Sequence, residues 1–403
     1  MRELIGVEEA RRLVLGAAAV LPAEPVGLDE ALGRTLAAPV VSGGPVPAFA
    51  SSAMDGFAVR TADLASLPIT LPVAAEVAAG AVPERPVEAG TVVRIMTGAP
   101  VPEGADAVVP VEWTAEAGMG RVRIERAPEP GRHVRPAGED LHAGEVVLRA
   151  GQVVTPPVVG MLAALGEVRV VVRRVPRVAV VTTGDELVPA SATPAFGQLR
   201  DSNGPALAAQ VRAAGGTPLG PFHAADALDA LHAVLPGARE ADVLVFSGGV
   251  SMGDHDLVRV VLEEAGWTPC FWRVRQRPGK PLAFGTLDGV PVFGLPGNPV
   301  SSFVCFEQYV RPLLAALLGR AEVRRPLVSA VLDAPIRKAA GLHHFVRAVA
   351  RWGEDGRLYV RPSGPQGSNL YASVLRADGL IHLPEAADDP PAGSVVAFEP
   401  LGW

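Results

Sequence analysis

Between Ser247 and Ser301, apolar runs end repeatedly in clusters of Gly and Pro. The runs DVLVFS and VPVFGL each end in such a cluster, and two of the clusters lead into helix-start signals. In open α/β sheets, loops at the carboxyl ends of strands bind anionic ligands, because the free N–H groups of the following helix face outward. Three such loops within about sixty residues predict one composite pocket for a phosphorylated or oxyanionic molecule.

The first of these loops, GGVSMGDHD, offers backbone, hydroxyl and carboxylate groups to a ligand. Gly248 and Gly249 let the backbone approach closely, and Ser251 adds a hydroxyl donor. Asp254 and Asp256 lie two residues apart, and the alternative interpretation is a glycine turn followed by a helix N-cap. Because Asp256 suffices as a cap and Asp254 is then left without that role, we favour a binding loop.

The other two loops, RPGKP and GLPGNP, combine the fixed φ of Pro with Gly residues that admit a ligand against the backbone. Arg277 and Lys280 flank Gly279 as candidate anion ligands. Lys280 is one of two lysines in a chain that otherwise uses Arg, although chance retention explains one residue equally well. Neither GxxxxGK[ST] nor GxGxxG occurs, so an ordinary nucleotide triphosphatase and a dinucleotide enzyme are not supported.

Two shorter motifs carry groups that bind metals in other proteins. TTGDEL follows an apolar run, and its acids Asp185 and Glu186 are placed to face a metal ion unless they only begin a helix. His343 and His344 have no second His or Cys pair at metal-ligand spacing. We therefore expect a metal role for the acids and a surface role for the histidines.

Composition indicates a soluble globular protein. Of the 403 residues, 49% are hydrophobic and 20% charged, and the formal net charge of -7 argues against broad binding to nucleic acid or to an anionic membrane. The acidic N-terminus is unlike a secretory signal, and no run of about 18 apolar residues is present. Cys270 and Cys305 lack a CxxC partner, so neither a disulfide nor a zinc site is expected. We expect a cytoplasmic protein in a reducing compartment.

The pattern of strands and helices predicts an α/β multidomain chain. Residues 1–44 and 138–174 form a discontinuous N-terminal domain, interrupted by a β-rich segment, 45–137, that is dense in Pro and Gly. Strands and helices alternate over 175–322, which predicts a doubly wound α/β domain. Residues 323–403 return to strand-like runs and predict a small C-terminal β domain.

Apolar periodicity and capping residues predict the main elements. Helices are expected over Val7–Ala19 and Leu28–Leu36, and Asn298-Pro299 opens a long helix that ends at Leu318. Asp288-Gly289 predicts a hairpin turn. The strands expected in the inserted segment are Ile69–Val77, Val92–Met96, Ala107–Val111 and Arg121–Glu125.

Taken in chain order, the motifs SAMDGFA, MTGAP, GEDLHAG, TTGDEL, RDSN, GGVSMGD, PGKPLAFG and GLPGNPVSS resemble one family. This family is the molybdopterin molybdenumtransferases, the bacterial MoeA proteins and the related gephyrin E domain. The resemblance implies four domains, an α/β domain like molybdopterin adenylyltransferase, and an elongated homodimer. The implied reaction inserts molybdate into the dithiolene of adenylated molybdopterin, with hydrolytic release of AMP. Expected partners include molybdopterin adenylyltransferase and acceptor molybdoenzymes, but neither nucleic acid nor a membrane.

The resemblance also implies functional positions. Carboxylates suit Mg²⁺, a hard cation that bridges phosphate oxygens, and Glu186 and Asp256 are its expected ligands. Cationic side chains suit phosphate or molybdate. The matched catalytic positions are Asp55, Thr97, Asp140, Glu186, Asp256 and Lys280. The positions expected to bind the pterin substrate are Gly248, Gly249, Ser251, Arg277, Gly279, Pro296, Gly297, Asn298 and Pro299.

The chain departs from the family pattern at a few positions. Phe57 and Leu257 stand where members often have Tyr, and Arg277 stands where Lys is common. Ala224-Ala225 replaces an Asp pair, which leaves open whether Asp226 supplies the missing acidic contact. Two alternatives also stay open. The retained acids argue against a non-catalytic molybdopterin-binding scaffold, and the SAMDGFA and MTGAP loops argue against a molybdopterin adenylyltransferase.

Overall fold

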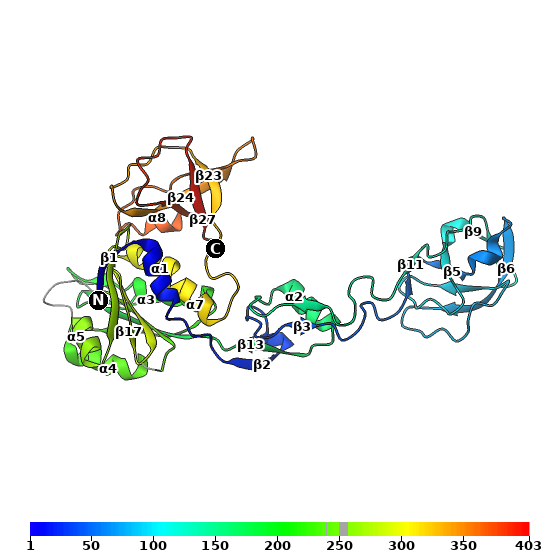
Figure 1. Ribbon diagram of the computed structural model, residues 1–403, viewed down its shortest axis with the longest axis horizontal. Coiled ribbons are helices and arrows are strands. Elements are labelled where there is room, and N and C mark those ends of the chain that lie inside the picture. The colour runs from blue at the N-terminus through cyan, green and yellow to red at the C-terminus, as the bar shows by residue number, and fades with distance from the viewer. Residues whose placement is uncertain (239, 250–256, 403) are drawn as a thin grey trace. The chain divides into compact units, whose positions relative to one another are not determined.

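The computed structural model describes residues 1–238, 240–249 and 257–402 (Figure 1). The predicted ligands Ser251 and Asp256, and Asp254 beside them, lie outside these ranges. Contacts within the chain define two compact units. The first comprises Met1–Ala38, Ala150–Val159 and the chain from Val168 onward, and the second comprises Pro39–Arg149 and Gly160–Glu167.

The first unit contains a seven-stranded sheet in the order β1-β19-β21-β22-β18-β14-β17. Neighbouring strands are parallel except where β21 pairs with β19 and with β22. The hairpin predicted at Asp288-Gly289 connects β21 to β22. The strands are β1 (Arg2–Ile5), β14 (Arg177–Thr183), β17 (Thr217–Ala224), β18 (Val243–Ser247), β19 (Thr268–Val274), β21 (Ala283–Leu287) and β22 (Val290–Leu295).

Helices cover both faces of this sheet, as expected for a doubly wound domain (Figure 1). Successive strand residues point to opposite faces. Val178 and Val180 of β14 therefore pack with α1, α3, α6 and α7, whereas Ala179 and Val181 pack with α4 and α5. The helices are α1 (Val7–Leu15), α3 (Asn203–Ala213), α4 (Leu228–Ala238), α5 (Leu257–Glu264), α6 (Pro299–Cys305) and α7 (Arg311–Leu317).

The first fifteen residues differ from the expected domain organisation, which placed them in the N-terminal domain. β1 pairs in parallel with β19 at the edge of the large sheet, with Arg2 opposite Phe271. The apolar stripe of α1, which includes Val7, Ala10 and Val14, is buried in the core of that sheet. A strand and an amphipathic helix bury their apolar surface on any sheet that offers a matching edge or face. The order of elements along the sequence does not specify which sheet that is.

Small two-stranded sheets join residues from either side of the inserted segment. β2 (Ala23–Gly27) pairs with β13 (Arg169–Arg173), and β3 (Val40–Val41) pairs with β12 (Val146–Leu148). The helix expected over Leu28–Leu36 is wrong, because only a 3₁₀ turn, Leu28–Glu30, forms. The residues after it form isolated β-bridges instead, such as Thr35 to Val153. α2 spans Pro156–Ala164.

The second unit is β-rich. Its six-stranded sheet has the order β8-β5-β7-β6-β10-β9, and β4 pairs separately with β11. The four strands predicted here all form, and three of them end one residue early. The elements are β4 (Ser51–Ser52), β5 (Gly56–Val59), β6 (Ile69–Val77), β7 (Val92–Ile95), β8 (Ala107–Pro110), β9 (Thr114–Glu116), β10 (Arg121–Ile124) and β11 (Val134–Arg135), with 3₁₀ turns Thr61–Leu64 and Val111–Trp113.

The C-terminal strands form a sheet in the order β24-β25-β23-β27-β26. The last strand, β26, also pairs with β24, and this pairing closes the sheet into a small barrel. The α/β region adds the short strand β20 (Gln276–Arg277), which pairs with β24 at His343 and His344. The RPGKP segment is thereby attached to the barrel. The remaining elements are β23 (Val328–Leu332), β24 (His343–Trp352), β25 (Leu358–Pro362), α8 (Ala372–Leu375), β26 (Gly379–Leu383) and β27 (Val395–Pro400).

The helix predicted to run to Leu318 is interrupted by a π-helical segment, Phe306–Val310, between α6 and α7. All five residues of the segment are buried, so the helix has no solvent face there. A π-helical segment inserts a residue and redirects side chains, and an apolar periodicity does not reveal it. None of the helices in the described ranges combines the length and apolar character that a membrane crossing requires.

Candidate functional site

A cavity of ≈ 690 Å³ lies at the carboxyl ends of the parallel strands β14, β17, β18 and β22. This is the edge at which open α/β sheets bind ligands. Its wall includes seven of the predicted positions, which the loops after β14, β18 and β22 bring together: Glu186, Gly248, Gly249, Pro296, Gly297, Asn298 and Pro299. Residues that were not predicted as ligands also line it, among them Thr183, Asn203 and Asn369, and so does Asp226, whose role was left open.

Asn203 joins three of these loops, a role that sequence reasoning missed. Its side-chain amide donates to Ser247 Oγ at 2.9 Å and to the Gly297 carbonyl at 2.8 Å. The signal was present in the RDSN motif, which sequence analysis used only as part of the family resemblance. Capping itself falls to Asp201, which accepts the Gly204 N–H at 2.9 Å and the Thr182 hydroxyl at 2.8 Å.

The glycine pair after β18 is required by the packing of the cavity wall. Gly248 has φ +95°, and a Cβ atom there would lie 2.6 Å from the Thr183 carbonyl oxygen. A side chain at Gly249 would lie 2.7 Å from Thr183 Oγ1. Thr183 Oγ1 is itself buried without a hydrogen-bond partner among the described residues. The loop therefore presents backbone rather than side chains to the cavity.

Acidic residues gather at one side of this cavity. Glu186 and Asp226 both line it, and the Asp226 N–H donates to Asp185 Oδ1 at 2.9 Å. Burial and then the neighbouring charges of Asp185 and Glu186 raise the pKa of Asp226. Within the described ranges, no group of three or more His, Cys, Asp or Glu residues is arranged to hold a metal ion. The cavity lining thus includes the carboxylates of Glu186 and Asp226, beside that of Asp201, which accepts bonds from Thr182 and Gly204. The predicted ligand Asp256 lies outside those ranges.

A second, smaller cavity of ≈ 90 Å³ lies where the RPGKP segment meets the barrel. Arg277, Arg337 and Arg347 line it, and none of its lining residues in the described structure is acidic. The Arg347 side chain is only 1% exposed and donates to neutral oxygens alone: Ser373 Oγ at 3.0 Å, the Gly367 carbonyl at 3.1 Å and the Pro365 carbonyl at 3.4 Å. Such a cavity favours a small anion.

The electrostatics of the small cavity agree with this geometry. Burial and then the charge of Arg277 lower the pKa of Arg347 to about 10, so it stays protonated near pH 7. His344 also lines the cavity, and its buried Nε2 has no partner among the described residues. The surface role expected for the histidine pair is wrong, since both side chains are buried. Burial lowers the pKa of His343 to about 3 and of His344 to about 4.

The Arg277–Pro281 segment connects the two cavities. Arg277 and Pro278 line the small cavity, whereas Pro281 lines the large one. The exposed Lys280 lies between them in sequence, and its carbonyl accepts the N–H groups of Val274 and Leu282 at 3.0 Å. One turn therefore reaches both an anion-sized cavity and a larger ligand cavity.

The remaining predicted positions, Asp55, Thr97 and Asp140, belong to the second unit. Thr97 donates to Asp55 through both its backbone N–H and its hydroxyl. Asp140 is exposed, and its backbone N–H donates to the Val46 carbonyl at 3.0 Å. The structure thus brings Asp55 and Thr97 into direct contact.

Comparison with known proteins gives one consistent result. The MoeA N-terminal region (domain I and II) matches residues 5–166, the probable molybdopterin binding domain matches 179–316, and the MoeA C-terminal region (domain IV) matches 329–401. Molybdopterin molybdenumtransferase 2 of Mycobacterium tuberculosis is 38% identical over 96% of this chain and 97% of its own length. The chain belongs to the molybdopterin molybdenumtransferase family.

Further relatives support the family over nearly the full length. The molybdopterin molybdenumtransferase of Haemophilus influenzae is 37% identical over 94% of both proteins. The crystal structure of a molybdopterin biosynthesis MoeA protein from Pyrococcus horikoshii has a TM-score of 0.85 at 32% identity, covering 99% of this chain and 100% of that one. An adenylyltransferase and a non-catalytic scaffold are not favoured, since these relatives carry the transferase name and match beyond the α/β domain.

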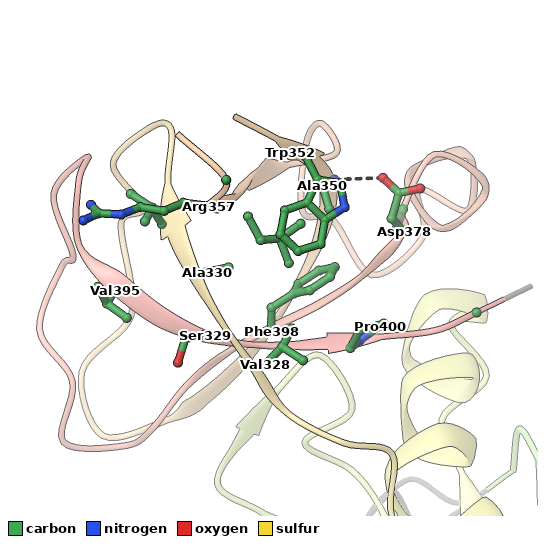
Figure 2. Close-up of a pocket in the computed structure, with 15 residues that line it drawn as sticks. Val328, Ser329, Ala330, Ala350, Trp352, Arg357, Asp378, Val395, Phe398 and Pro400 are labelled. Atoms are coloured by element: carbon green, nitrogen blue, oxygen red, sulfur yellow. Dashed lines mark hydrogen bonds between the residues drawn. The ribbon is translucent and has the colours of Figure 1, made fainter. Parts of the chain in front are cut away.

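Another cavity, of ≈ 820 Å³, is not this site. Figure 2 shows it within the barrel, where Phe398, Ala350 and Trp352 form much of its apolar lining and Asp378 accepts the Ala350 N–H at 2.8 Å. None of the predicted functional residues lines it. An apolar surface without convergent polar groups does not suit a phosphorylated substrate of this family.

Proposed function

We propose that this chain inserts molybdate into the dithiolene of adenylated molybdopterin, with hydrolytic release of AMP. The observation that carries the proposal is the single turn, Arg277–Pro281, that lines both an acid-free cationic cavity and the large cavity at the strand ends. Molybdate is a small oxyanion and suits the former, and a phosphorylated pterin suits the latter. The family relatives carry the transferase name.

In this proposal the large cavity binds adenylated molybdopterin. The Gly248-Gly249 backbone approaches the phosphates, and Ser202 and Asn203, at the start of α3, line the same cavity. Asn203 holds the loops at Ser247 and Gly297 in a fixed relation. The substrate therefore meets a preformed surface, which lowers the ordering that binding requires.

In this proposal molybdate binds in the small cavity. Arg347, whose bonds within the described residues include no carboxylate, and Arg277 attract the oxyanion, and Lys280 adds a positive charge along the turn. Neutral His344 accepts or donates one hydrogen bond without adding charge. These residues hold the anion and orient it for transfer.

Magnesium fits the acidic side of the large cavity. The raised pKa of Asp226 reflects repulsion by Asp185 and Glu186 as well as burial, and a divalent cation relieves such repulsion. Glu186 and Asp226 would hold the ion together with the predicted ligand Asp256. When bound, Mg²⁺ neutralises phosphate charge at the bond to AMP. Asp226 then supplies the acidic contact that the missing Asp pair provides in other members.

Asp55, Thr97 and Asp140 complete the proposed catalytic set. Thr97 keeps the Asp55 carboxylate ionised and oriented, which suits a group that positions a water molecule. We further propose a cytoplasmic homodimer that receives its substrate from molybdopterin adenylyltransferase and delivers the product to acceptor molybdoenzymes.

The test incubates the purified full-length chain with adenylated molybdopterin, molybdate and MgCl₂, and follows AMP by chromatography. We expect AMP release that requires both molybdate and Mg²⁺, together with formation of molybdenum cofactor detected by reconstitution of an apo-molybdoenzyme. Tight binding of adenylated molybdopterin without AMP release would instead indicate a scaffold. Formation of adenylated molybdopterin from ATP would indicate an adenylyltransferase.

A further inference from the structure

A network of neutral, fully buried side chains contacts the turn between the two cavities. Gln276 Nε2 donates to the Gly279 carbonyl at 3.0 Å and lies 3.4 Å from Cys305 Sγ. The Cys305 thiol lies 3.6 Å from the same carbonyl, and the Tyr309 hydroxyl donates to Gln276 Oε1. Gln276, Cys305 and Tyr309 each have 0% exposure, so no water competes for these bonds.

The turn is packed directly against this network. Gly279 has φ +87°, and a Cβ atom there would lie 2.4 Å from Cys305 Sγ and 2.8 Å from Gln276 Nε2. The next carbonyl, that of Lys280, is held by the N–H groups of Val274 and Leu282. Two successive carbonyls of the turn therefore have fixed directions, and so does the backbone that carries the cationic side chains.

The network holds the turn without adding charge to it. Burial raises the pKa of the Cys305 thiol and of the Tyr309 hydroxyl well above their ordinary values, so both stay protonated. A carboxylate in the same place would bond the turn but would also neutralise the positive charge of Arg277. A neutral amide, thiol and phenol preserve that charge for a ligand.

The network also connects the turn to the large cavity. Cys305 ends α6 and Tyr309 lies in the π-helical segment that follows. α6, which leads directly into that segment, begins at Pro299, and Pro299 lines the large cavity. A rigid helix thus contacts one cavity at its first residue and the turn of the other cavity through Gln276.

We propose that Gln276 is a positioning residue for the oxyanion: held by Tyr309 and Cys305, it fixes the turn that places Arg277 at the small cavity and Pro281 at the large one. This inference rests on the proposed function, because molybdate is the oxyanion concerned. Gln276 does not contact the anion cavity itself, since it does not line it. Its effect is transmitted through the Gly279 carbonyl.

The test compares Gln276→Leu, Tyr309→Phe and Cys305→Ser in the full-length chain. Losing a buried hydrogen bond of this kind corresponds to about a tenfold change in affinity. We expect the KM for molybdate in the AMP-release assay, and the Kd of sodium molybdate by calorimetry, to rise about tenfold in Gln276→Leu and less in Tyr309→Phe. The kcat at saturating molybdate should be unchanged. Cys305→Ser should stay close to the original chain, because a hydroxyl keeps the donor to Gly279.

Gln308→Leu is the matched control. This variant removes a buried amide from the π-helical segment that also contains Tyr309, but the hydrogen-bond partners of Gln308 are Arg11 and Glu399. We expect a lower Tm and an unchanged KM for molybdate. If a folded Gln276→Leu keeps the original KM, the inference is overturned. If Gln276→Leu does not fold, an unchanged KM in Tyr309→Phe overturns it. Failure of the original chain to release AMP refutes the proposed function instead, and molybdate calorimetry still tests the network.

Discussion

Thr97 donates both its backbone N–H, at 2.7 Å, and its hydroxyl, at 2.8 Å, to the same oxygen of Asp55. The backbone bond and then the hydroxyl bond lower the pKa of Asp55, and Arg94 adds a smaller effect. Asp55 is exposed, so the pair presents an oriented, ionised carboxylate to solvent. Two residues that are far apart in the sequence thus form one functional group.

Thr97→Val should raise the pKa of Asp55 towards its ordinary value, because the hydroxyl donor is lost and the backbone donor remains. A lowered pKa keeps the carboxylate charged down to more acidic pH, so the acid limb of AMP release should move to higher pH in the variant. Carbon-detected NMR titration measures the pKa directly. Thr61→Val is the control, since Thr61 donates its backbone N–H and its hydroxyl to the two carboxylate oxygens of Asp106. An unchanged acid limb would show that Asp55 does not govern activity.

Lys280→Ala and Arg277→Ala should weaken molybdate binding, because each removes a positive charge from the turn beside the anion cavity. The loss of one charge-assisted bond corresponds to at least about a tenfold rise in Kd. Calorimetry with sodium molybdate measures it, and circular dichroism checks the fold. Arg273→Ala is the matched control, since its partner Glu3 lies 3.6 Å away and Arg273 lines neither cavity. If the original chain and the three variants all bind molybdate with the same Kd, the Arg277–Pro281 turn is not part of the anion site.

Glu186→Gln and Asp226→Asn should raise the Mg²⁺ concentration needed for half-maximal AMP release. The folded-state pKa of Asp226 is raised, so without metal the folded chain loses stability as pH rises from the ordinary pKa through the raised one. Mg²⁺ should therefore increase Tm at neutral pH in the original chain and less in either variant. Glu240→Gln, which changes only an exposed pair with Arg177, should behave like the original chain. A full Mg²⁺ response in Glu186→Gln contradicts the assignment.

Glu399→Gln should destabilise the contact between the barrel and the helices. Burial opposes the charge of Glu399, but bonds from His382 at 2.7 Å and Gln308 at 2.8 Å outweigh it and lower its pKa. The stabilisation is therefore present above the ordinary pKa and lost as pH falls through the lowered one. Breaking a buried pair costs about 3 kcal/mol, which urea unfolding at pH 7 measures.

The control for that prediction is a pair nearer the surface of the same barrel. Asp333→Asn alters the contact with Arg351 at 2.9 Å and should cost under about 1 kcal/mol. The Glu399→Gln chain should also show a flatter dependence of stability on pH below neutrality than the original chain. If both variants lose the same free energy of unfolding, the buried contacts of Glu399 contribute no more than an exposed ion pair does.

Local sequence patterns were sufficient for much of the fold and for the large cavity. The alternation of apolar runs with polar and Gly/Pro loops predicted the parallel strands, and three of those loops meet at Glu186, Gly248 and Pro296. The Asp288-Gly289 hairpin was also confirmed. These features depend on residue order over a few positions and on the rule that parallel strands share a carboxyl edge.

Local sequence patterns did not predict packing between residues that are far apart in the chain. The helix expected over Leu28–Leu36, the buried state of His343 and the π-helical segment at Phe306–Val310 all depend on which surfaces meet across the chain. The same is true of the placement of β1, which pairs with β19 more than two hundred and fifty residues away. Propensity carries no information about such partners.

The sequence by itself determined the residue types of the site: glycines where the backbone needs room, acids after strand ends, and a Lys within RPGKP. Only the tertiary structure decided how they work together. It placed Arg347 beside Arg277 without a carboxylate, Asn203 across three loops, and Gln276 against the Gly279 carbonyl. The physical reason is that hydrogen bonding, burial and charge depend on distance in space, whereas a motif records only distance along the chain.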